Sequence, residues 1–426
     1  MTTRAVFLTE PYSAYKHTAV PREDSELTHV GPGTPCGEYL RRFWQPVCLT
    51  SELTDLPMAI KIMGEDLVVF RDFSGQIGCL ELHCPHRGTS LEFGLVSEKG
   101  IRCCYHGWLF DTDGVILETP GEPVDSTMKD RLCHGAYPTH EFKGLVFAYL
   151  GPTELKPAFP VYDTYHWPGT RIVANRREYN DCNWLQIKEN SMDPVHLSFL
   201  HTRTAGTQFT DEFGVLAELE FMDTPVGMTY IATRRVDENV WLRMGEFMLP
   251  NIHQFGANME NGRVEHPRQP PIMCQWAVPI DDVQTVKVSY RIIPDGIDDI
   301  LSIVDFGQIN DRPYEERQRI PGDYDALVGQ RDITVHDLEH LATSDVGVIL
   351  LRNLLRKHIR NLLEGQEPVP APTDDNGLTR TNASDTVMHI PAAPTEPEDV
   401  ILLRETGLKV AQQYINNPQQ LPKSTD

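Results

Sequence analysis

The first third of the chain alternates short apolar runs with glycine-containing turns, a pattern typical of short β-strands. The last of these runs is closed by a Gly-Pro pair at 151–152. We therefore predict a small all-β module at 37–152, after an N-terminal arm at 1–36. Its predicted elements are a short helix at 37–44, two strands around a Gly-Glu-Asp turn within 59–70, and strands at 75–82, 108–110 and 144–150.

The rest of the chain mixes strand-like runs with segments in which apolar residues recur at helical spacing. Six prolines between 366 and 397 predict an extended surface segment there. We expect a second domain at 153–365, the proline-rich segment at 366–397, and a final helix with its tail at 398–426. The predicted strands are 171–174, 227–235, 275–280 and 284–291, and the predicted helices are 182–200, 335–363 and 398–414.

The composition restricts the partners of this chain of 426 residues. A formal net charge of -23 repels phosphate, which argues against nucleic acid and anionic membranes as partners. The nine cysteines show no disulfide spacing outside one motif, so we expect a reducing compartment, the cytoplasm. The N-terminal apolar run is too short for a signal peptide, and no apolar run is long enough to predict a membrane span.

Residues 84–106 carry the strongest chemical signal. A Cys84-x-His86 pair and a Cys103-x-x-His106 pair are separated by 16 residues. Two thiolates and two imidazoles on paired loops suit a [2Fe-2S] cluster, with the thiolates on one iron and the imidazoles on the other. A structural zinc site also uses two cysteines and two histidines, but it usually places both cysteines in one half. The mixed order therefore favours the cluster.

A second motif follows about 90 residues later, with Asp193, His196 and His201 in the order Asp-x-x-His-x-x-x-x-His. Two imidazoles plus one carboxylate form the facial triad of non-haem iron oxygenases, which leaves positions for O₂ and substrate. Five residues on a regular helix rotate by about 140°, too far for one metal. A π-bulge or a break between the histidines would bring them together. Two unrelated histidines on a partly buried helix are the alternative.

Both motifs resemble those of the Rieske non-haem iron oxygenases. Arg87-Gly88 and the Tyr-His-Gly-Trp sequence at 105–108 complete the likeness of the first motif, although Cys104 stands where many members have proline. The resemblance implies that His196 and His201 bind a mononuclear iron. It also implies that Asp193 bridges the Rieske histidine of one subunit to an iron-binding histidine of the next, in a cyclic trimer. Asp193 could equally serve as a helix N-terminal residue before a proline.

The third iron ligand must be a distant carboxylate. Residues 321–345 resemble the C-terminal part of the phthalate-dioxygenase-like branch, and alignment on Glu339-His340-Leu341-x-x-Ser-Asp places the ligand at Asp323. Asp325 and Asp332 are rivals, because the family often has Gln or Glu before the ligand and this chain has Gly322. His336 and His340 are interpreted as ordinary helix residues.

The resemblance implies an α+β fold, in which an all-β Rieske domain precedes a catalytic domain of the helix-grip type with a curved antiparallel sheet. It implies a terminal oxygenase that receives electrons of NAD(P)H through a separate flavin/iron-sulfur reductase. This enzyme would activate O₂ at the Fe(II) and hydroxylate a small aromatic substrate. A homotrimer or stacked trimers are expected. The alternatives are an O- or N-demethylating monooxygenase and, in another class, a Rieske electron carrier with a ligand-binding domain; a zinc-stabilised binding module is a third.

Overall fold

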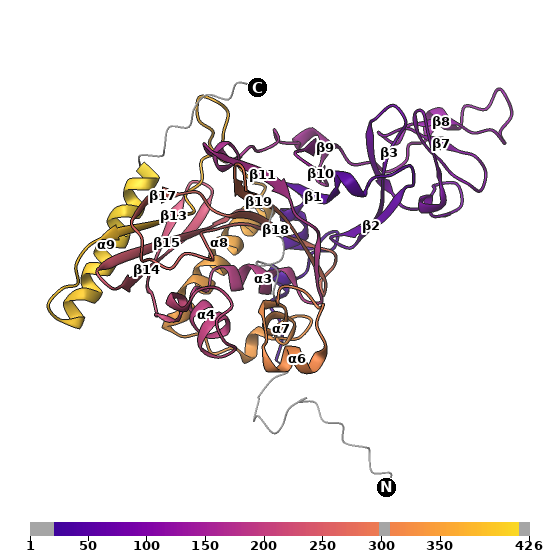
Figure 1. Cartoon of the computed structure of the whole chain (residues 1–426). Helices are drawn as coiled ribbons and strands as arrows, with labels where there is room; N and C mark the ends of the chain where they lie inside the picture. Colours follow the sequence, from indigo (N-terminus) through magenta and orange to yellow (C-terminus); the bar gives the residue numbers. More distant parts are fainter. Residues whose placement is uncertain (1–20, 298–306, 417–426) are drawn as a thin grey trace, which may run out of the picture.

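Three small antiparallel sheets make up the N-terminal part of the chain, much of which projects as a lobe from a larger body (Figure 1). The computed structural model describes residues 21–297 and 307–416. Two short helices, α1 (Ser25–Thr28) and α2 (Pro35–Leu40), precede the sheets. The sheets are β1–β10–β9 (Trp44–Leu49, Leu145–Tyr149, Thr139–Phe142), β2–β3–β4 (Met58–Ile62, Glu65–Arg71, Ile77–Glu81) and β5–β6–β7–β8 (Leu95–Ser97, Gly100–Arg102, Leu109–Phe110, Ile116–Glu118).

The lobe contains a tight hairpin, β2–β3, and a small hydrophobic core of its own. Strands β2 and β3 are joined by a two-residue turn at Met63 and Gly64, which both adopt positive φ. This is the mirror-image turn that suits the twist of a hairpin. Aliphatic and aromatic side chains of β3, β4, β6 and β7 pack under the two Cys-His loops, with Cys84 and Cys103 among them. The loops therefore rest on a packed base.

The sheet β1–β10–β9 joins the lobe to the body. Its apolar side chains belong to the same core as those of the large sheet, and the Phe147 and Trp276 rings lie 5.7 Å apart. The N–H groups of Met63 and Gly64 donate to the carbonyls of Pro279 and Ile280. A shared core and these hydrogen bonds fix the lobe against the body.

The body is built on a ten-stranded antiparallel sheet. The main strand order is β11-β19-β18-β16-β15-β14-β13, while β12 pairs with β19, and β20 pairs with β15 and β17. The expected α+β class, with a large antiparallel sheet and helices, is confirmed. The strands are β11 Thr170–Ala174, β12 Glu178–Asn180, β13 Glu218–Thr224, β14 Gly227–Val236, β15 Asn239–Met248, β16 Ile252–Phe255, β17 His266–Gln269, β18 Met273–Pro279, β19 Thr285–Pro294 and β20 Ser384–His389.

Helices cover both faces of this sheet. The long helix α9 (Glu396–Asn416) packs on the face that carries Ile231 and Met244. Helices α3 (Trp184–Ser191) and α8 (Val346–Leu363) pack on the opposite face, which carries Tyr230. Three shorter helices complete the body: α4 (Val195–Ser198), α6 (Tyr314–Arg319) and α7 (Asp323–Val328). Within 21–297 and 307–416, none of the helices combines the length and the apolar character needed to cross a bilayer.

Two predicted elements are wrong. The helix predicted at 335–363 begins only at Val346, because 336–345 forms single turns whose polar groups pair with Asp24, just before α1, and with Arg352 on α8. The proline-rich segment at 366–397 is not all on the surface, because β20 lies within it and is largely buried. The prolines flank this strand rather than interrupt it.

The helix predicted at 182–200 is broken. It ends at Ser191, and a short break that includes Pro194 separates it from α4. The predicted domain boundaries stay predictions.

Candidate metal centres and pocket

The two Cys-His loops have matching backbones. In the first loop the Gly88 N–H donates to the Cys84 carbonyl (2.8 Å), and in the second the Gly107 N–H donates to the Cys103 carbonyl (3.1 Å). Both glycines have a φ of 73°, a conformation that residues with a Cβ rarely adopt. Each loop therefore turns back on itself within five residues and presents its cysteine and histidine on the same side.

In these loops the cysteine side chains are buried in the lobe and the histidine side chains lie nearer its surface. Cys84 and Cys103 are buried, whereas His86 and His106 are exposed or partly exposed with ring centroids 4.4 Å apart. The Trp108 ring stacks on His86 at 4.8 Å. Burial raises the pKa of the Cys84 thiol to about 11, so a bound cation is needed to keep it as a thiolate at neutral pH. Buried sulfur and outer imidazole suit a cluster whose two irons have different ligands.

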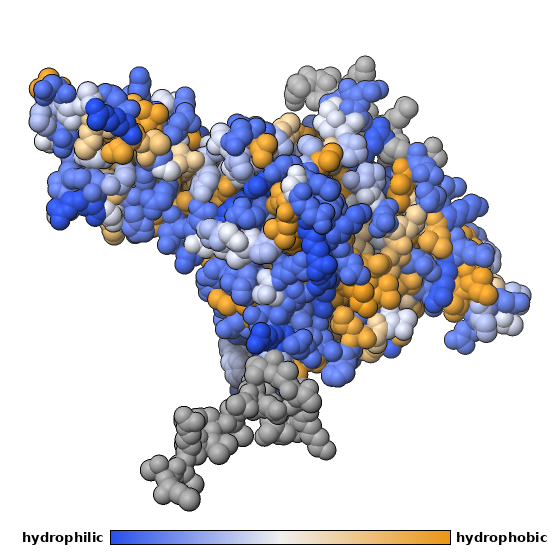
Figure 2. All heavy atoms as spheres, turned by 180° about the vertical axis from the view of Figure 1, so that it is seen from behind, coloured by the Kyte–Doolittle hydropathy of each residue, from blue (hydrophilic) through white to orange (hydrophobic). Residues whose placement is uncertain are grey.

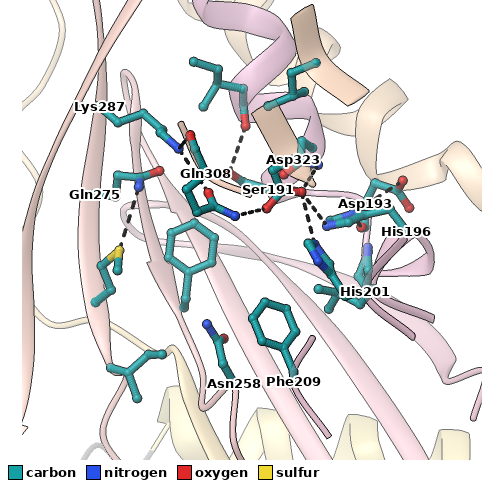
Figure 3. Close-up of a pocket in the computed structure, with 18 of the residues that line it drawn as sticks. Ser191, Asp193, His196, His201, Phe209, Asn258, Gln275, Lys287, Gln308 and Asp323 are labelled. Carbon is teal, nitrogen blue, oxygen red and sulfur yellow. Dashed lines mark hydrogen bonds and ion pairs between the residues drawn. The ribbon is translucent and has the colours of Figure 1, made fainter. Parts of the chain in front are cut away.

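A second group of ligand-type side chains lies in the body, where His196, His201 and Asp323 converge (Figure 3). The Asp323 Oδ1 atom lies 3.1 Å from His201 Nε2 and 3.7 Å from His196 Nε2. The two imidazole centroids are 5.3 Å apart. Two neutral imidazoles and one carboxylate at these separations could hold a divalent metal ion on one side and leave the other side open.

The helix geometry explains how histidines five residues apart meet. Helix α4 carries His196, and a π-helical turn at Phe199–Arg203 carries His201. The wider turn advances fewer degrees per residue than an α-helix, so both side chains point to the same side. The predicted π-bulge is thus present, and the break at Pro194 gives α4 a direction of its own.

The structure separates Asp323 from its rivals. Asp323 is the first residue of α7 and points toward the histidines. Asp325 instead pairs with Arg312 and Arg317 and accepts the Gly322 N–H, while Asp332 is exposed. Burial alone would raise the pKa of Asp323, but His201 and His196 outweigh it and hold the pKa of that carboxyl well below its usual range.

Two glutamines that the sequence analysis missed orient these side chains. The His201 Nδ1–H donates to Gln208 Oε1 (2.8 Å), which leaves Nε2 as the free ring nitrogen. The Gln208 amide donates to the carbonyls of Leu200 (3.3 Å) and Pro321 (3.0 Å). Gln208 therefore ties the π-helical turn to the segment just before Asp323.

Gln308 performs the corresponding role for the carboxylate. Its Nε2 donates to Asp323 Oδ2, and its Oε1 accepts from Lys287 Nζ (3.1 Å). Because the ammonium can only donate, this contact fixes the amide orientation. Lys287 itself pairs with Glu178 (3.0 Å), its direct cross-strand neighbour. Spacing in the sequence gives no signal for either glutamine.

Asp193 lies beside His196. Its backbone carbonyl contacts the His196 Nδ1 atom, and its carboxylate oxygen Oδ2 is 3.7 Å from the same nitrogen. The other oxygen, Oδ1, accepts the Val195 N–H at 2.9 Å. The Asp193 side chain is 28% exposed and also lines the pocket described below.

A pocket of about 90 Å³ opens beside the triad. Figure 3 shows Phe209 and Asn258 on one side of it, and Gln275, Lys287 and Gln308 on the other. The lining also includes Tyr230 and Arg243 from the sheet and apolar side chains from the surrounding strands and turns, among them Leu197, Phe255, Ile272 and Met273. This volume is below the roughly 300–1,000 Å³ of pockets for drug-sized ligands, so the pocket has room only for a small molecule.

A second cluster, Glu189 with His336 and Glu339, is a poorer metal site. The His336 Nδ1 accepts the Asp24 N–H, so in the neutral ring Nε2 carries the proton and offers no lone pair. Arg352 already pairs with both carboxylates. His336 and His340 are not helix residues, contrary to prediction: His336 lies in a 3₁₀ turn, and His340 lies in an irregular segment.

Comparisons with known proteins place the two Cys-His loops, and His196 and His201 of the second centre, in matched regions, whereas Asp323 lies outside them. Residues 43–129 match the Rieske [2Fe-2S] domain, and residues 180–256 match the vanillate O-demethylase oxygenase C-terminal domain. The chain is 43% identical over 415 residues to the oxygenase subunit of tert-butanol monooxygenase / tert-amyl alcohol desaturase from Aquincola tertiaricarbonis, covering 90% of this chain and 87% of that one. It is 39% identical over 376 residues to phenoxybenzoate dioxygenase subunit alpha from Ectopseudomonas oleovorans, covering 84% and 89%.

Solved structures share the fold. Pseudomonas putida NdmA with caffeine superposes with a TM-score of 0.60 at 20% identity, over 77% of this chain and 94% of that one. Dicamba monooxygenase bound to dicamba gives a TM-score of 0.59 at 20% identity, over 77% and 99%.

Proposed function

Because the chain belongs to the Rieske non-haem iron oxygenases, as a catalytic (alpha) subunit, we propose that it oxygenates a small organic substrate in the pocket beside His196, His201 and Asp323. Enzymes of this family contain a Rieske [2Fe-2S] cluster and a mononuclear non-haem iron, and they use O₂ and electrons that a separate reductase draws from NAD(P)H. The convergence of the three side chains on one wall of the pocket is the observation that carries the proposal.

We assign the ligands by the chemistry of their donor atoms. Cys84, His86, Cys103 and His106 hold the cluster, and His196, His201 and Asp323 hold the iron. When bound, these groups supply electron transfer and O₂ activation.

The chain's own residues prepare the iron site. Gln208 keeps Nε2 of His201 free, and Gln308 occupies Oδ2 of Asp323 so that Oδ1 faces the histidines. Phe209 packs against the His201 ring at 4.6 Å, which shields one side of the site from water. The pocket thus holds a substrate next to a site with open positions.

Asp193 is proposed to bridge two subunits. The lobe that carries β7 and β8 projects away from α4 and α7 (Figure 1), which argues against a short electron path within one chain. The carboxylate lies 3.7 Å from His196 and the side chain is partly exposed, as a link to a neighbouring subunit requires. The apolar side chains gathered on one side of the body in Figure 2 are compatible with assembly, and we propose a trimer or stacked trimers.

The names of the relatives suggest classes of substrate rather than one compound. One relative is named for a neutral tertiary alcohol and another for an aromatic acid, so ring hydroxylation is the first candidate and oxidative demethylation or hydroxylation of a neutral compound is the second. Outside the cluster motif the cysteines show no disulfide spacing in the sequence, and on this basis we propose the cytoplasm.

The function is tested by incubating the holoenzyme with a reductase, NADH, ¹⁸O₂ and a panel of small aromatic acids, aryl ethers and tertiary alcohols. The expected result is a product that carries ¹⁸O, formed only with the reductase present. NADH oxidation without labelled product from any compound, in protein shown to contain both iron centres, would contradict the proposal.

A further inference from the structure

Arg243 is a buried cation in the wall of the pocket. It lies on β15 with 2% of its surface exposed. Its Nε donates to the Ala257 carbonyl (3.1 Å), and one terminal nitrogen donates to the Gly256 carbonyl (3.1 Å) and Asn258 Oδ1 (3.4 Å). The other terminal nitrogen donates to the Tyr230 hydroxyl. These contacts hold the guanidinium in one position, but all of the acceptors are neutral.

No carboxylate of the described residues forms an ion pair with this guanidinium. The other charged groups of the pocket are matched, because Lys287 pairs with Glu178 and Asp323 lies against the two histidines. The buried Asp385 is the direct cross-strand neighbour of Arg243, although its hydrogen bonds come from Trp241 and Ala257. Burial raises the pKa of this carboxyl, and the charge of Arg243 counteracts that rise, so Asp385 is the nearby negative charge against which the cations of this region must be counted.

A second buried arginine brings the positive charges into excess. Arg234 is fully buried on β14, one strand away, and its charge lies over the rings of Phe213 and Trp241. The Phe213 ring also faces Arg243, at 5.7 Å. Two guanidinium groups therefore face one buried carboxylate, Asp385, on this side of the sheet, and the remaining positive charge favours a negative group in the pocket.

Donors without an acceptor surround the Arg243 head group. Tyr230 accepts from Arg243, so its own O–H remains to be donated, and the described residues offer it no acceptor. Asn258 turns its oxygen toward Arg243, because an arginine only donates. Its nitrogen must therefore point away from Arg243, and Figure 3 shows it directed toward the cavity. One N–H of the guanidinium also has no acceptor among these contacts.

The rest of the pocket wall suits an apolar body. Phe209 lies against the His201 ring, and Phe255 and Ile272 complete a wall with no charge. A molecule with an anionic end at Arg243 would place its apolar part along these side chains, beside the three proposed iron ligands.

We propose that Arg243, Tyr230 and Asn258 form a carboxylate-binding corner, and that the substrate is a small organic acid held there by its carboxylate. This inference rests on the proposed function, and it decides between an acidic and a neutral substrate. A structural role for Arg243, as an anchor for residues 256–258, explains its contacts with backbone carbonyls. It does not explain the unbalanced charge or the unused donors of Tyr230 and Asn258.

The test compares an acid with its neutral isostere. Binding of 3-chlorobenzoate and 3-chlorobenzamide to the resting holoenzyme is measured by calorimetry at pH 7.5. The acid is expected to bind at least about tenfold more tightly than the amide, the equivalent of one charge-assisted hydrogen bond. Equal binding, tighter binding of the amide, or binding of neither compound overturns the proposal.

Variants test whether the preference for the acid over the amide arises at Arg243 and Asn258. Arg243→Gln and Asn258→Asp are both expected to abolish the preference for the acid, the second by placing a carboxylate in the corner while keeping the shape of the side chain. Arg235→Gln is the matched control, because Arg235 lies next to Arg234 on β14 but pairs with Asp399 outside the pocket. An unchanged preference in folded Asn258→Asp protein overturns the proposal, even if Arg243→Gln fails to fold.

The two hypotheses fail in different ways. A holoenzyme that forms ¹⁸O-labelled product only from neutral compounds keeps the proposed function and overturns the carboxylate corner. Protein with both iron centres that labels no compound contradicts the proposed function itself.

Discussion

His201 and Gln208 show how a single amide prepares a metal ligand. The imidazole can bind a metal through Nε2 only when its proton sits on Nδ1, and Gln208 Oε1 accepts that proton's hydrogen bond. The same glutamine donates to the Pro321 carbonyl, two residues before Asp323. Loss of this side chain should therefore loosen two of the three ligands together.

We predict that Gln208→Leu weakens iron binding at the mononuclear site by roughly 10- to 100-fold, the usual effect of losing a residue that orients a metal ligand. Iron and acid-labile sulfide are measured on the purified variant, and sulfide should stay at the wild-type level. Gln208→Glu is the control, because it keeps an oxygen acceptor for Nδ1–H. Wild-type iron affinity in Gln208→Leu would remove Gln208 from the account.

From the sequence, the residues of the two centres can be predicted only where they form a motif with a fixed spacing. The order of Cys84, His86, Cys103 and His106 was sufficient to favour a cluster. The resemblance placed the third ligand at Asp323 but left Asp325 and Asp332 as rivals, and the fold directs Asp323 to the histidines. Gln208, Gln308 and Arg243 belong to no motif, so only the structure places them at the site.

At the level of elements, α3 carries a buried lysine behind the pocket. The Lys188 Nζ donates to the Gln275 carbonyl at 3.4 Å and is fully enclosed. Burial lowers its pKa to about 7. The unfolded chain keeps this proton up to its ordinary pKa of about 10.4.

A pH dependence of stability follows from this difference. Between about pH 7 and 10 the unfolded state binds more protons than the folded state, so this group makes the folded state more stable as pH rises. We predict that Lys188→Met removes up to about 1.4 kcal/mol per pH unit of this slope between pH 7 and 9. Urea unfolding is measured at each pH, with the exposed Lys61→Met as control. Identical slopes in the wild-type and Lys188→Met proteins would refute the buried neutral lysine.

Two of the mispredicted elements, β20 and residues 336–345, share one physical cause. β20 is short, polar and flanked by prolines, and it forms because it pairs with β15 and β17 far away in the sequence. Residues 336–345 have helical spacing, yet Arg352 and Asp24 draw their polar groups into tertiary contacts. Local pattern cannot report such long-range partners, whereas β3, β14 and β19 were visible because their apolar runs are long.

At the scale of the whole molecule, the chain separates its two proposed iron centres. The cluster loops lie on the projecting lobe, and the triad lies in the body (Figure 1). We propose that electrons pass between them through contact with another subunit. Asp193 is the residue proposed to make that contact, since its carboxylate lies next to His196 and its side chain is partly exposed.

We predict that Asp193→Asn retains both iron centres but slows electron transfer from the reduced cluster by at least about 100-fold, because the amide lacks the charge that holds both imidazoles. Single-turnover oxidation of the cluster, followed by its absorbance after O₂ and substrate are added, measures this rate. Wild-type kinetics in the variant would exclude Asp193 from the electron path.

The central claim, that two separate iron centres cooperate in oxygenation, is tested most directly by removing only the mononuclear iron. The cluster is reduced without O₂, and O₂ and substrate are then added to protein with and without iron at His196, His201 and Asp323. The account predicts one round of product formation in the complete protein and none in the depleted protein, with activity restored by Fe(II). Product formation without that iron would contradict it.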